Sequence, residues 1–227
     1  MQYRFLNAIE ETILKRAYSI WGIFELYDKE KLIVSSIITT HPKKEGLQID
    51  KLTIQNRFSL SHTMDVSNNY VGSKANVTES TIRKVFLWSK PLECSDLLLQ
   101  LGPVSMGIQI GTIKKKKFLP GLNFAELVLN HHRNNSLEFP HIIVNEKAAN
   151  LVCYGRDIMG GSIISCYNKI KDNQVLIILN EKKEVLGLGR SRFSSLLLTS
   201  PNVITVDTVE DIGTFYLQTE NKELEGK

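Results

Sequence analysis

The stretch that decides the fold reads EFPHIIVNEKAANLVCYGRD from Glu138 to Asp157 and continues with IMGGSII at 158–164. Two later segments complete it, VLGLGR at 185–190 and VEDIGTFY at 209–216. Short apolar runs that end at glycine or polar turns are typical of strands, and a helical pattern follows the first run. About 80 residues with a helix, glycine turns and three or more strands predict one small β-barrel.

The helix and the strands of this stretch have specific signals. Asn145 is a preferred helix N-cap, and Glu146 follows it where the helix dipole favours an anion. The helix is expected to end near Val152, and residues 180–183 are expected to form a hairpin turn. The predicted strands, which share short apolar runs, cover 142–144, 163–164, 175–179, 185–190 and parts of 205–217.

The N-terminal segment predicts an amphipathic helix. Apolar residues recur there every three or four positions, which is the spacing of one helical face. They are Phe5, Leu6, Ile9, Ile13, Leu14, Ala17 and Trp21. The charged residues Glu10, Glu11, Lys15 and Arg16 are assigned to the opposite face. We expect this helix to pack on a sheet, and the alternative is a helix that binds a partner.

The segment between this helix and the barrel predicts strands and a domain boundary. Its apolar runs favour strands at 24–27, 32–38, 82–90 and 104–113, with a returning segment at 118–129. The polar run from His131 to Ser136 is the best linker in the chain. We therefore predict an α+β protein with a mixed α/β domain at 1–135, a barrel domain at 136–220 and a flexible tail at 221–227.

Composition excludes several classes of protein. No apolar run approaches the roughly 20 residues of a membrane-spanning helix. The three cysteines, Cys94, Cys153 and Cys166, are too few and too scattered for a disulfide scaffold. The first residues lack an apolar core with a small-residue cleavage site, so we expect no secretory signal. The expected location is the cytoplasm, or the nucleus and nucleolus in a eukaryote.

Positive charge is unevenly distributed along the chain. The net charge is +4, with 18 Lys and Arg against 13 Asp and Glu in residues 1–139. Residues 140–220 hold 8 basic against 9 acidic residues, so the barrel region is not basic overall. Because neutralisation of phosphates drives sequence-independent binding to nucleic acid, any such binding by the barrel requires a local basic patch.

The basic residues of the barrel region outside its helix and hairpin turn are the candidates for this patch. They are Arg156, Lys169, Lys171, Arg190 and Arg192. Arg190 and Arg192 are expected on one side of a strand, because strand side chains alternate between faces. We therefore predict a nucleic-acid surface at this end of the barrel.

Three glycines and two tyrosines are further candidates for the same surface. Gly155, Gly160 and Gly161 allow a backbone to approach a ligand closely, or they only form the tight turns of a small barrel. Tyr154 and Tyr167 can stack on a base, or they belong to the core or the barrel rim.

The densest positive charge in the chain is the run Lys114, Lys115, Lys116 and Lys117. On a β-turn these lysines would present ammonium groups to the phosphates of RNA. The alternative is a solvated turn whose lysines protect a sheet edge from pairing. In the first case the lysine run supplies the positive charge that the barrel lacks.

Motifs for catalysis and metal binding are weak. The sequence holds no Gly-x-Ser-x-Gly elbow, P-loop or complete GxGxxG motif. Two histidines and two cysteines, His131, His132, Cys153 and Cys166, lack the CxxC or HxxxH spacing of a zinc site. The acidic cluster at 207–211 favours a solvated turn over a cation site. We predict no catalytic residue, no metal and no cofactor.

The order of these features resembles the PUA domain, the RNA-binding module of pseudouridine synthases and archaeosine transglycosylases. The resemblance rests on the helix Glu146–Val152, the Tyr-Gly-Arg-Asp turn at 154–157, Gly-Leu-Gly-Arg at 187–190 and Ile-Gly-Thr-Phe-Tyr at 212–216. Upstream, residues 106–131 are similar to the segment that precedes the PUA domain in the NIP-seven family.

This resemblance implies a mixed α/β pre-PUA domain followed by a PUA-type β-barrel, and it implies no catalytic residues. NIP-seven proteins assist biogenesis of the large ribosomal subunit, and their archaeal relatives bind RNA through the PUA part. By position, Tyr154, Gly155, Arg156, Gly160 and Gly161 occupy the loop that PUA domains present to RNA.

We therefore predict a non-catalytic RNA-binding protein that assists rRNA processing and assembly of the large ribosomal subunit, with rRNA as the first expected ligand and tRNA as the second. The alternative is a PUA-containing subunit or relative of an RNA-modification enzyme, such as a pseudouridine synthase, a transglycosylase or an RNA methyltransferase. A third interpretation is a protein-interaction module that binds another assembly factor. Salt-dependent RNA binding separates the first from the third.

Overall fold

The structure is a computed structural model that describes residues 3–42, 77–88, 99–101, 103, 106–133 and 137–214. The chain forms two compact units, one of residues 1–37 with 82–227 and the other of residues 38–81. The candidate sites described below lie in the larger unit. The boundary expected at 135–136 also falls within it and stays a prediction, and the expected tail at 221–227 lies outside the described residues.

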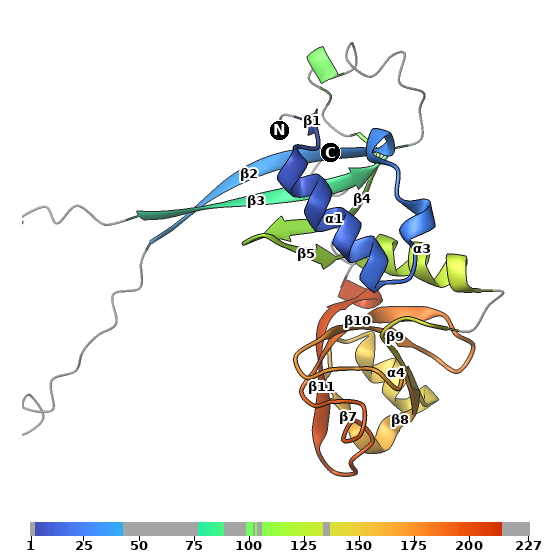
Figure 1. Cartoon of the computed structure of the whole chain (residues 1–227). Coiled ribbons are helices and arrows are strands. Elements are labelled where there is room, and N and C mark those ends of the chain that lie inside the picture. Colours follow the sequence, from blue (N-terminus) through green and yellow to red (C-terminus); the bar gives the residue numbers. More distant parts are fainter. Residues whose placement is uncertain are drawn as a thin grey trace, which may run out of the picture. The chain divides into compact units, whose positions relative to one another are not determined.

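Five strands form the N-terminal sheet, in the order β1-β2-β3-β4-β5 (Figure 1). Their bounds are Tyr3–Phe5 for β1, Leu32–Pro42 for β2, Val77–Leu87 for β3, Ile108–Lys114 for β4 and Lys117–Pro120 for β5. β1 pairs antiparallel with β2, and β4 pairs antiparallel with both β3 and β5. The strands predicted at 32–38, 82–90 and 104–113 are confirmed, with different ends.

The predicted N-terminal helix is confirmed as α1, Ala8–Ile20, but its buried face differs from the expected one. The helix begins at a capping box, in which the Glu10 N–H donates to Asn7 Oδ1 at 2.9 Å and the Asn7 N–H donates to a Glu10 carboxylate oxygen at 3.1 Å. Ile9, expected in the buried stripe, is 64% exposed, whereas Glu10, expected on the polar face, is only 1% exposed.

Two arginines explain the burial of Glu10. Arg4 in β1 donates two hydrogen bonds to the Glu10 carboxylate, at 2.8 and 2.7 Å, and Arg83 in β3 lies 3.2 Å from it. Burial alone would raise the pKa of Glu10, but the bonds from Arg4 and from the Asn7 N–H, together with both charges, hold it below its ordinary value. The helix periodicity could not predict this because both arginines belong to other elements.

Two other expectations about this region are wrong. Residues 24–27 do not form a strand, because Leu26 and Tyr27 donate to the carbonyls of Ile23 and Phe24 and close a 3-10 turn, η1 (Phe24–Leu26). A second turn, η2 (Lys29–Lys31), leads into β2. The segment 118–129 is a strand only to Pro120. After Gly121 it forms the helix α3, Leu122–His132.

The helix α3 has a buried face that explains why it is not a strand. The buried residues recur at helical spacing, and they are Leu122, Phe124, Ala125, Val128, Leu129 and His132. His131 and His132, expected in a linker, are therefore the last residues of this helix.

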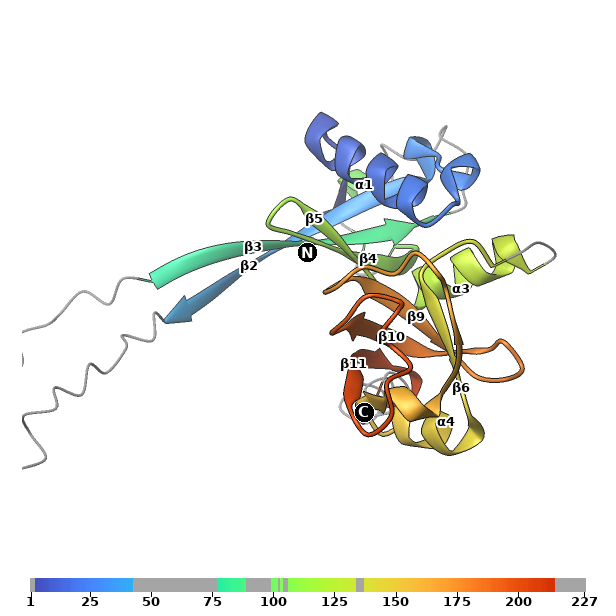
Figure 2. The same ribbon diagram turned by 60° about the horizontal axis from the view of Figure 1, so that its bottom comes forward.

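The C-terminal part forms a six-stranded sheet that curls into a barrel, in the order β7-β11-β10-β9-β6-β8. Figure 2 labels four of these strands, β11, β10, β9 and β6. The strands are β6 His141–Val144, β7 Ile158–Met159, β8 Ile163–Cys166, β9 Val175–Leu179, β10 Val185–Ser191 and β11 Ile204–Asp211. The helix α4 covers Glu146–Val152, and its N-cap is Asn145, whose side chain accepts from the Ala148 N–H at 2.9 Å. A short 3-10 turn, η4 (Gly160–Ser162), joins β7 to β8. These strands and this helix confirm the predicted order.

The strand β9 contributes to two hydrophobic cores. Leu176 and Ile178 pack inside the barrel with α4, whereas Ile177 and Leu179 pack with residues of α1, α3 and the N-terminal sheet. Alternate side chains of one strand point to opposite faces, and this explains why the whole run Val175–Leu179 is apolar.

Candidate functional site

The turn after α4 presents exposed side chains in a fixed conformation. Gly155 has φ of +70°, and its N–H donates to the Val152 carbonyl at 2.8 Å, while the Arg156 N–H donates to the Leu151 carbonyl at 3.2 Å. This is the glycine-terminated helix end known as the Schellman motif. Tyr154 is 81% exposed and Arg156 is exposed, so the glycine sets the positions of both neighbours.

A threonine of β11 holds this turn against the barrel. The Thr208 hydroxyl donates to the Arg156 carbonyl at 2.8 Å, and the Thr208 N–H donates to Asp157 Oδ1 at 3.0 Å. Thr208 lies opposite Gly189 of β10. The turn is thereby fixed beside the last residues of β10, where Arg190 is located.

Arg190 lies in β10, whereas Arg192 follows the last residue of that strand, so the expectation that both lie on one side of a strand is wrong. The two arginines also have different partners. Arg190 donates to the side-chain oxygen of Asn173 at 3.1 Å, a neutral group. Arg192 donates from Nε to Asp207 Oδ1 at 2.7 Å, its Nη2 also contacts that oxygen, and it lies 3.9 Å from Asp157. The charge of Arg192 is therefore compensated within the protein, whereas Arg190 forms no ion pair with a carboxylate of the described residues, although Asp207 lies opposite it in β11.

The loop between β8 and β9 adds two lysines to the same end of the barrel. The Ser191 hydroxyl donates to the Lys171 carbonyl at 2.7 Å, and the Lys171 N–H donates to the Gln174 side chain at 2.8 Å. Lys169 and Lys171 are both exposed. The contacts thus link the segments that carry these residues: Ser191, next to Arg190 and Arg192, binds the Lys171 carbonyl, and Arg192 lies near Asp157, the neighbour of Arg156.

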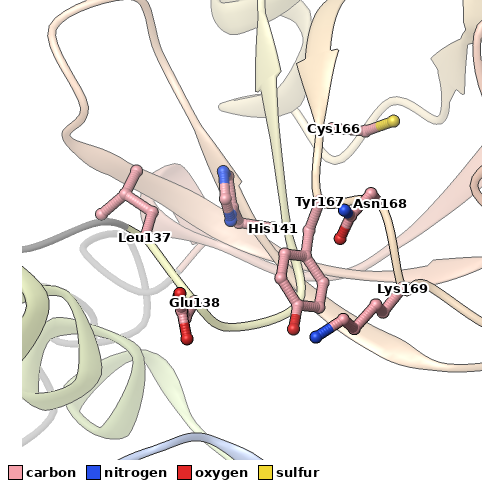
Figure 3. A pocket seen from close by; sticks show the side chains of 7 residues that line it. All are labelled: Leu137, Glu138, His141, Cys166, Tyr167, Asn168 and Lys169. Carbon is pink, nitrogen blue, oxygen red and sulfur yellow. The ribbon is translucent and has the colours of Figure 1, made fainter.

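An open hollow of about 470 Å³ lies at the base of this loop. Leu137, Glu138, His141, Cys166, Tyr167, Asn168 and Lys169 line it, and Figure 3 shows Tyr167, Asn168 and Lys169 following one another along their loop. Sequence reasoning missed His141 and Asn168, since neither belongs to a charge cluster or a motif.

Burial favours the neutral form of the histidine in this hollow. Burial lowers the pKa of His141 below its ordinary value of 6.5, more than the bond to the Phe139 carbonyl raises it. That bond, 2.8 Å long, requires the proton on Nδ1, because a carbonyl only accepts. The Nε2 atom is then a hydrogen-bond acceptor.

The glycine pair after β7 packs against another segment of the same chain. Gly160 is buried, and a Cβ atom there would collide with the carbonyl oxygens of Leu198 and Ser200. Gly161 is exposed, and the nearest atom to its hypothetical Cβ is the Pro201 Cα at 3.7 Å. The close approach that Gly160 permits is therefore made by the loop before β11.

The tetralysine lies on the other sheet, in the turn between β4 and β5. Lys114 and Lys117 face each other across the turn, and all four lysines are exposed. Lys115 and Lys116 have φ of +47° and +62°, the left-handed conformation that such two-residue turns require. The predicted turn is confirmed, and the structure places it beside α1 rather than on the barrel.

The acidic residues at 207–211 lie in the strand β11, so the expectation of a solvated turn there is wrong. Asp207 binds Arg192, and Asp211 accepts from the Thr214 N–H at 2.7 Å. His132 contacts the Trp21 carbonyl at 3.3 Å. Over the described part of the chain, no group of three or more His, Cys, Asp or Glu residues is arranged to hold a metal ion. In the same part, no helix has the length and apolar character to cross a membrane.

Comparison with known proteins identifies the fold of the barrel. A family model described as the UPF0113 PUA domain matches residues 140–221. A UPF0113 protein of Archaeoglobus fulgidus is 33% identical over 96 residues, which are 42% of this chain and 51% of that protein. The chain therefore spans about half the length of the curated relative that it matches.

Two solved structures resemble the whole chain. A hypothetical protein of Pyrococcus horikoshii superposes with a TM-score of 0.53 at 14% identity, covering 92% of this chain and 93% of that one. A conserved PUA domain protein of Thermoplasma acidophilum gives 0.50 at 10% identity, covering 96% and 99%. These likenesses concern the fold, and they confirm the α+β class with a PUA-type barrel.

Proposed function

We propose that this chain is a non-catalytic protein that binds RNA through the basic end of its PUA-type barrel. The observation that carries the proposal is the presence there of basic residues from three elements, namely the exposed Arg156 after α4, the exposed Lys169 and Lys171 before β9, and the half-buried Arg190 in β10. Over the described residues, none of these four side chains forms an ion pair with a carboxylate. Their charges are available to phosphates, which supply most of the sequence-independent affinity for nucleic acid.

The remaining candidates have supporting roles in this proposal. Arg192 orders the surface through Asp207 and Asp157, and it contributes little net charge. Gly155 fixes the turn that positions Arg156, and Tyr154 offers an exposed ring on which an unpaired base can stack. The hollow beside Lys169 gives room for a nucleotide that leaves a helix, which is how proteins read single-stranded RNA.

The biological setting that we propose is assembly of the large ribosomal subunit, with rRNA as the ligand. This rests on the resemblance of residues 106–131 and of the PUA-type barrel to the NIP-seven family. The alternative is an RNA-modification enzyme or a subunit of one, and the observation in its favour is the group of titratable side chains around the hollow, namely Glu138, His141, Cys166, Tyr167 and Lys169.

The test compares two pairs of basic residues, one at the proposed surface and one in the turn between β9 and β10. Arg156→Ala with Arg190→Ala removes free charges at the proposed surface. Lys182→Ala with Lys183→Ala removes two exposed charges from the β9–β10 turn. Binding of a single-stranded RNA is measured by fluorescence anisotropy over a range of salt concentrations.

We expect the arginine pair to weaken binding and to lower the slope of log affinity against log salt by about 0.7 for each lost phosphate contact. The lysine pair should leave the slope unchanged. Equal effects of the two pairs would place the RNA elsewhere, and no measurable binding at low salt would refute the proposed function. Crosslinking in cells followed by sequencing would then identify the RNA.

A further inference from the structure

A groove of about 360 Å³ runs between α1 and the β4–β5 hairpin, away from the barrel surface described above. From α1 it is lined by Ile13, Arg16 and Ile20, and from the hairpin by Lys116, Lys117 and Phe118. Both walls lie in the larger unit of the chain, and α1 contacts β5 directly. The groove combines an apolar floor with a basic rim.

The floor of the groove is mainly aliphatic. Ile20, at the end of α1, is 54% exposed, although its neighbour Trp21 is only 5% exposed. The rings of Trp21 and Phe118 both pack edge-on against Phe124, at 6.0 and 5.1 Å between centroids. Trp21 is therefore buried, Phe118 and Ile13 are half-buried, and Ile20 is the most exposed apolar side chain of the groove.

The rim carries positive charge that the protein does not neutralise. Within the described part of the chain, Arg16, Lys116 and Lys117 form no ion pair with a carboxylate. Lys15, the neighbour of Arg16, differs because it pairs with Glu11 at 2.7 Å. In addition, Lys116 adopts a left-handed conformation that costs a non-glycine residue energy. A glycine there would relieve the cost but remove a charge from the rim.

We infer that this groove binds an acidic amphipathic segment of a partner protein. Aliphatic side chains of the segment would bury Ile20 and Ile13, and its carboxylates would pair with Arg16, Lys116 and Lys117. RNA suits the groove less well, because bases bind by stacking on exposed aromatic faces and the floor offers aliphatic groups. The proposal is independent of RNA binding by the barrel.

The first test uses one substitution and a matched control on the same helix. The probe is a labelled synthetic peptide with leucines at helical spacing and glutamates elsewhere, measured by fluorescence anisotropy with the full chain. Ile20→Glu places a negative charge on the floor and should weaken peptide binding about tenfold or more. Ile9→Glu changes an equally exposed isoleucine of α1 that does not line the groove, and it should leave binding unchanged.

The second test exchanges the charges. Arg16→Glu combined with Lys117→Glu should abolish binding of the acidic peptide, and a peptide with lysines in place of glutamates should bind this variant instead. Circular dichroism is the control that checks whether each variant is folded.

Three outcomes would overturn the inference. Ile20→Glu and Ile9→Glu could affect the peptide equally, which would remove the groove from the interaction. A loss of RNA affinity in Ile20→Glu would make the groove part of the RNA surface. Self-association seen by light scattering and lost in Ile20→Glu would make a second copy of the chain the occupant.

Discussion

The buried carboxylate of Glu10 allows a quantitative prediction for Glu10→Gln. The substitution keeps the shape of the side chain but removes the charge that holds Arg4 and Arg83 together. Losing one partner of a fully buried ion pair costs about 3–5 kcal/mol, and losing an exposed pair costs at most about 1 kcal/mol. Glu10 is 1% exposed, but the arginine side chains are 41% and 33% exposed and can regain water.

We therefore expect Glu10→Gln to lower the free energy of unfolding by about 2 kcal/mol at pH 7, between these limits. For a chain of this length that corresponds to a fall in Tm of roughly 4–8 °C. The measurement is thermal and urea unfolding followed by circular dichroism. Glu11→Gln is the matched control, because Glu11 lies on the same helix and pairs with Lys15 on the surface. Its Tm should not change measurably.

The pH dependence gives a second, independent readout. The folded-state pKa of Glu10 lies below its ordinary value of 4.5, so the folded state binds this proton less readily than the unfolded state. The stabilisation is fully present above pH 4.5 and is lost as the pH falls through the folded-state pKa. The difference between wild type and Glu10→Gln should therefore shrink in acid. An equal effect of both substitutions at pH 7, or a difference that persists unchanged in acid, would refute this account.

Two glycine substitutions give further predictions. Gly160→Ala should lower the Tm strongly, because its Cβ would collide with backbone, whereas Gly161→Ala, with its nearest contact at 3.7 Å, should change the Tm little. Equal Tm values for the two variants would contradict the packing described for Gly160. Gly155→Ala should cost roughly 1 kcal/mol in urea unfolding, because φ is +70° there. It should also weaken RNA binding through Arg156, and unchanged affinity would show that the turn does not position that residue for RNA.

Local signals predicted the barrel well. Asn145 marks the start of α4 because an N-cap bonds only to its own first turn, and the apolar runs of β6, β9 and β10 are short and bounded by polar residues. The tetralysine turn is likewise a local feature. The sequence did not predict the helix α3. Its apolar residues fall in the segment 118–129, which was expected to return after the lysine turn, although their spacing of three and four is helical.

The parts that could not be predicted depend on contacts between distant segments. Neither Arg4 nor Arg83 follows the periodicity of α1, so nothing in the helix indicates that Glu10 is buried. Arg192 looks like a free cation in the sequence, but the adjacent strand supplies Asp207 as its partner. The candidate site therefore has fewer uncompensated positive charges than the sequence predicts. The difference arises because the register of β10 and β11 places Asp207 within reach of Arg192.

Because β9 contributes to two cores, the barrel depends on the rest of the chain for part of its stability. If the barrel were excised, Ile177 and Leu179 of β9 and Val185 and Leu188 of β10 would lose the cover of α1, α3 and the N-terminal sheet. Each buried aliphatic side chain contributes on the order of 2 kcal/mol to stability. The excised barrel would therefore lose stability and expose a hydrophobic surface on this side. We therefore expect the isolated barrel to be less stable than the same barrel in the full chain, because part of its hydrophobic surface is covered by the N-terminal elements.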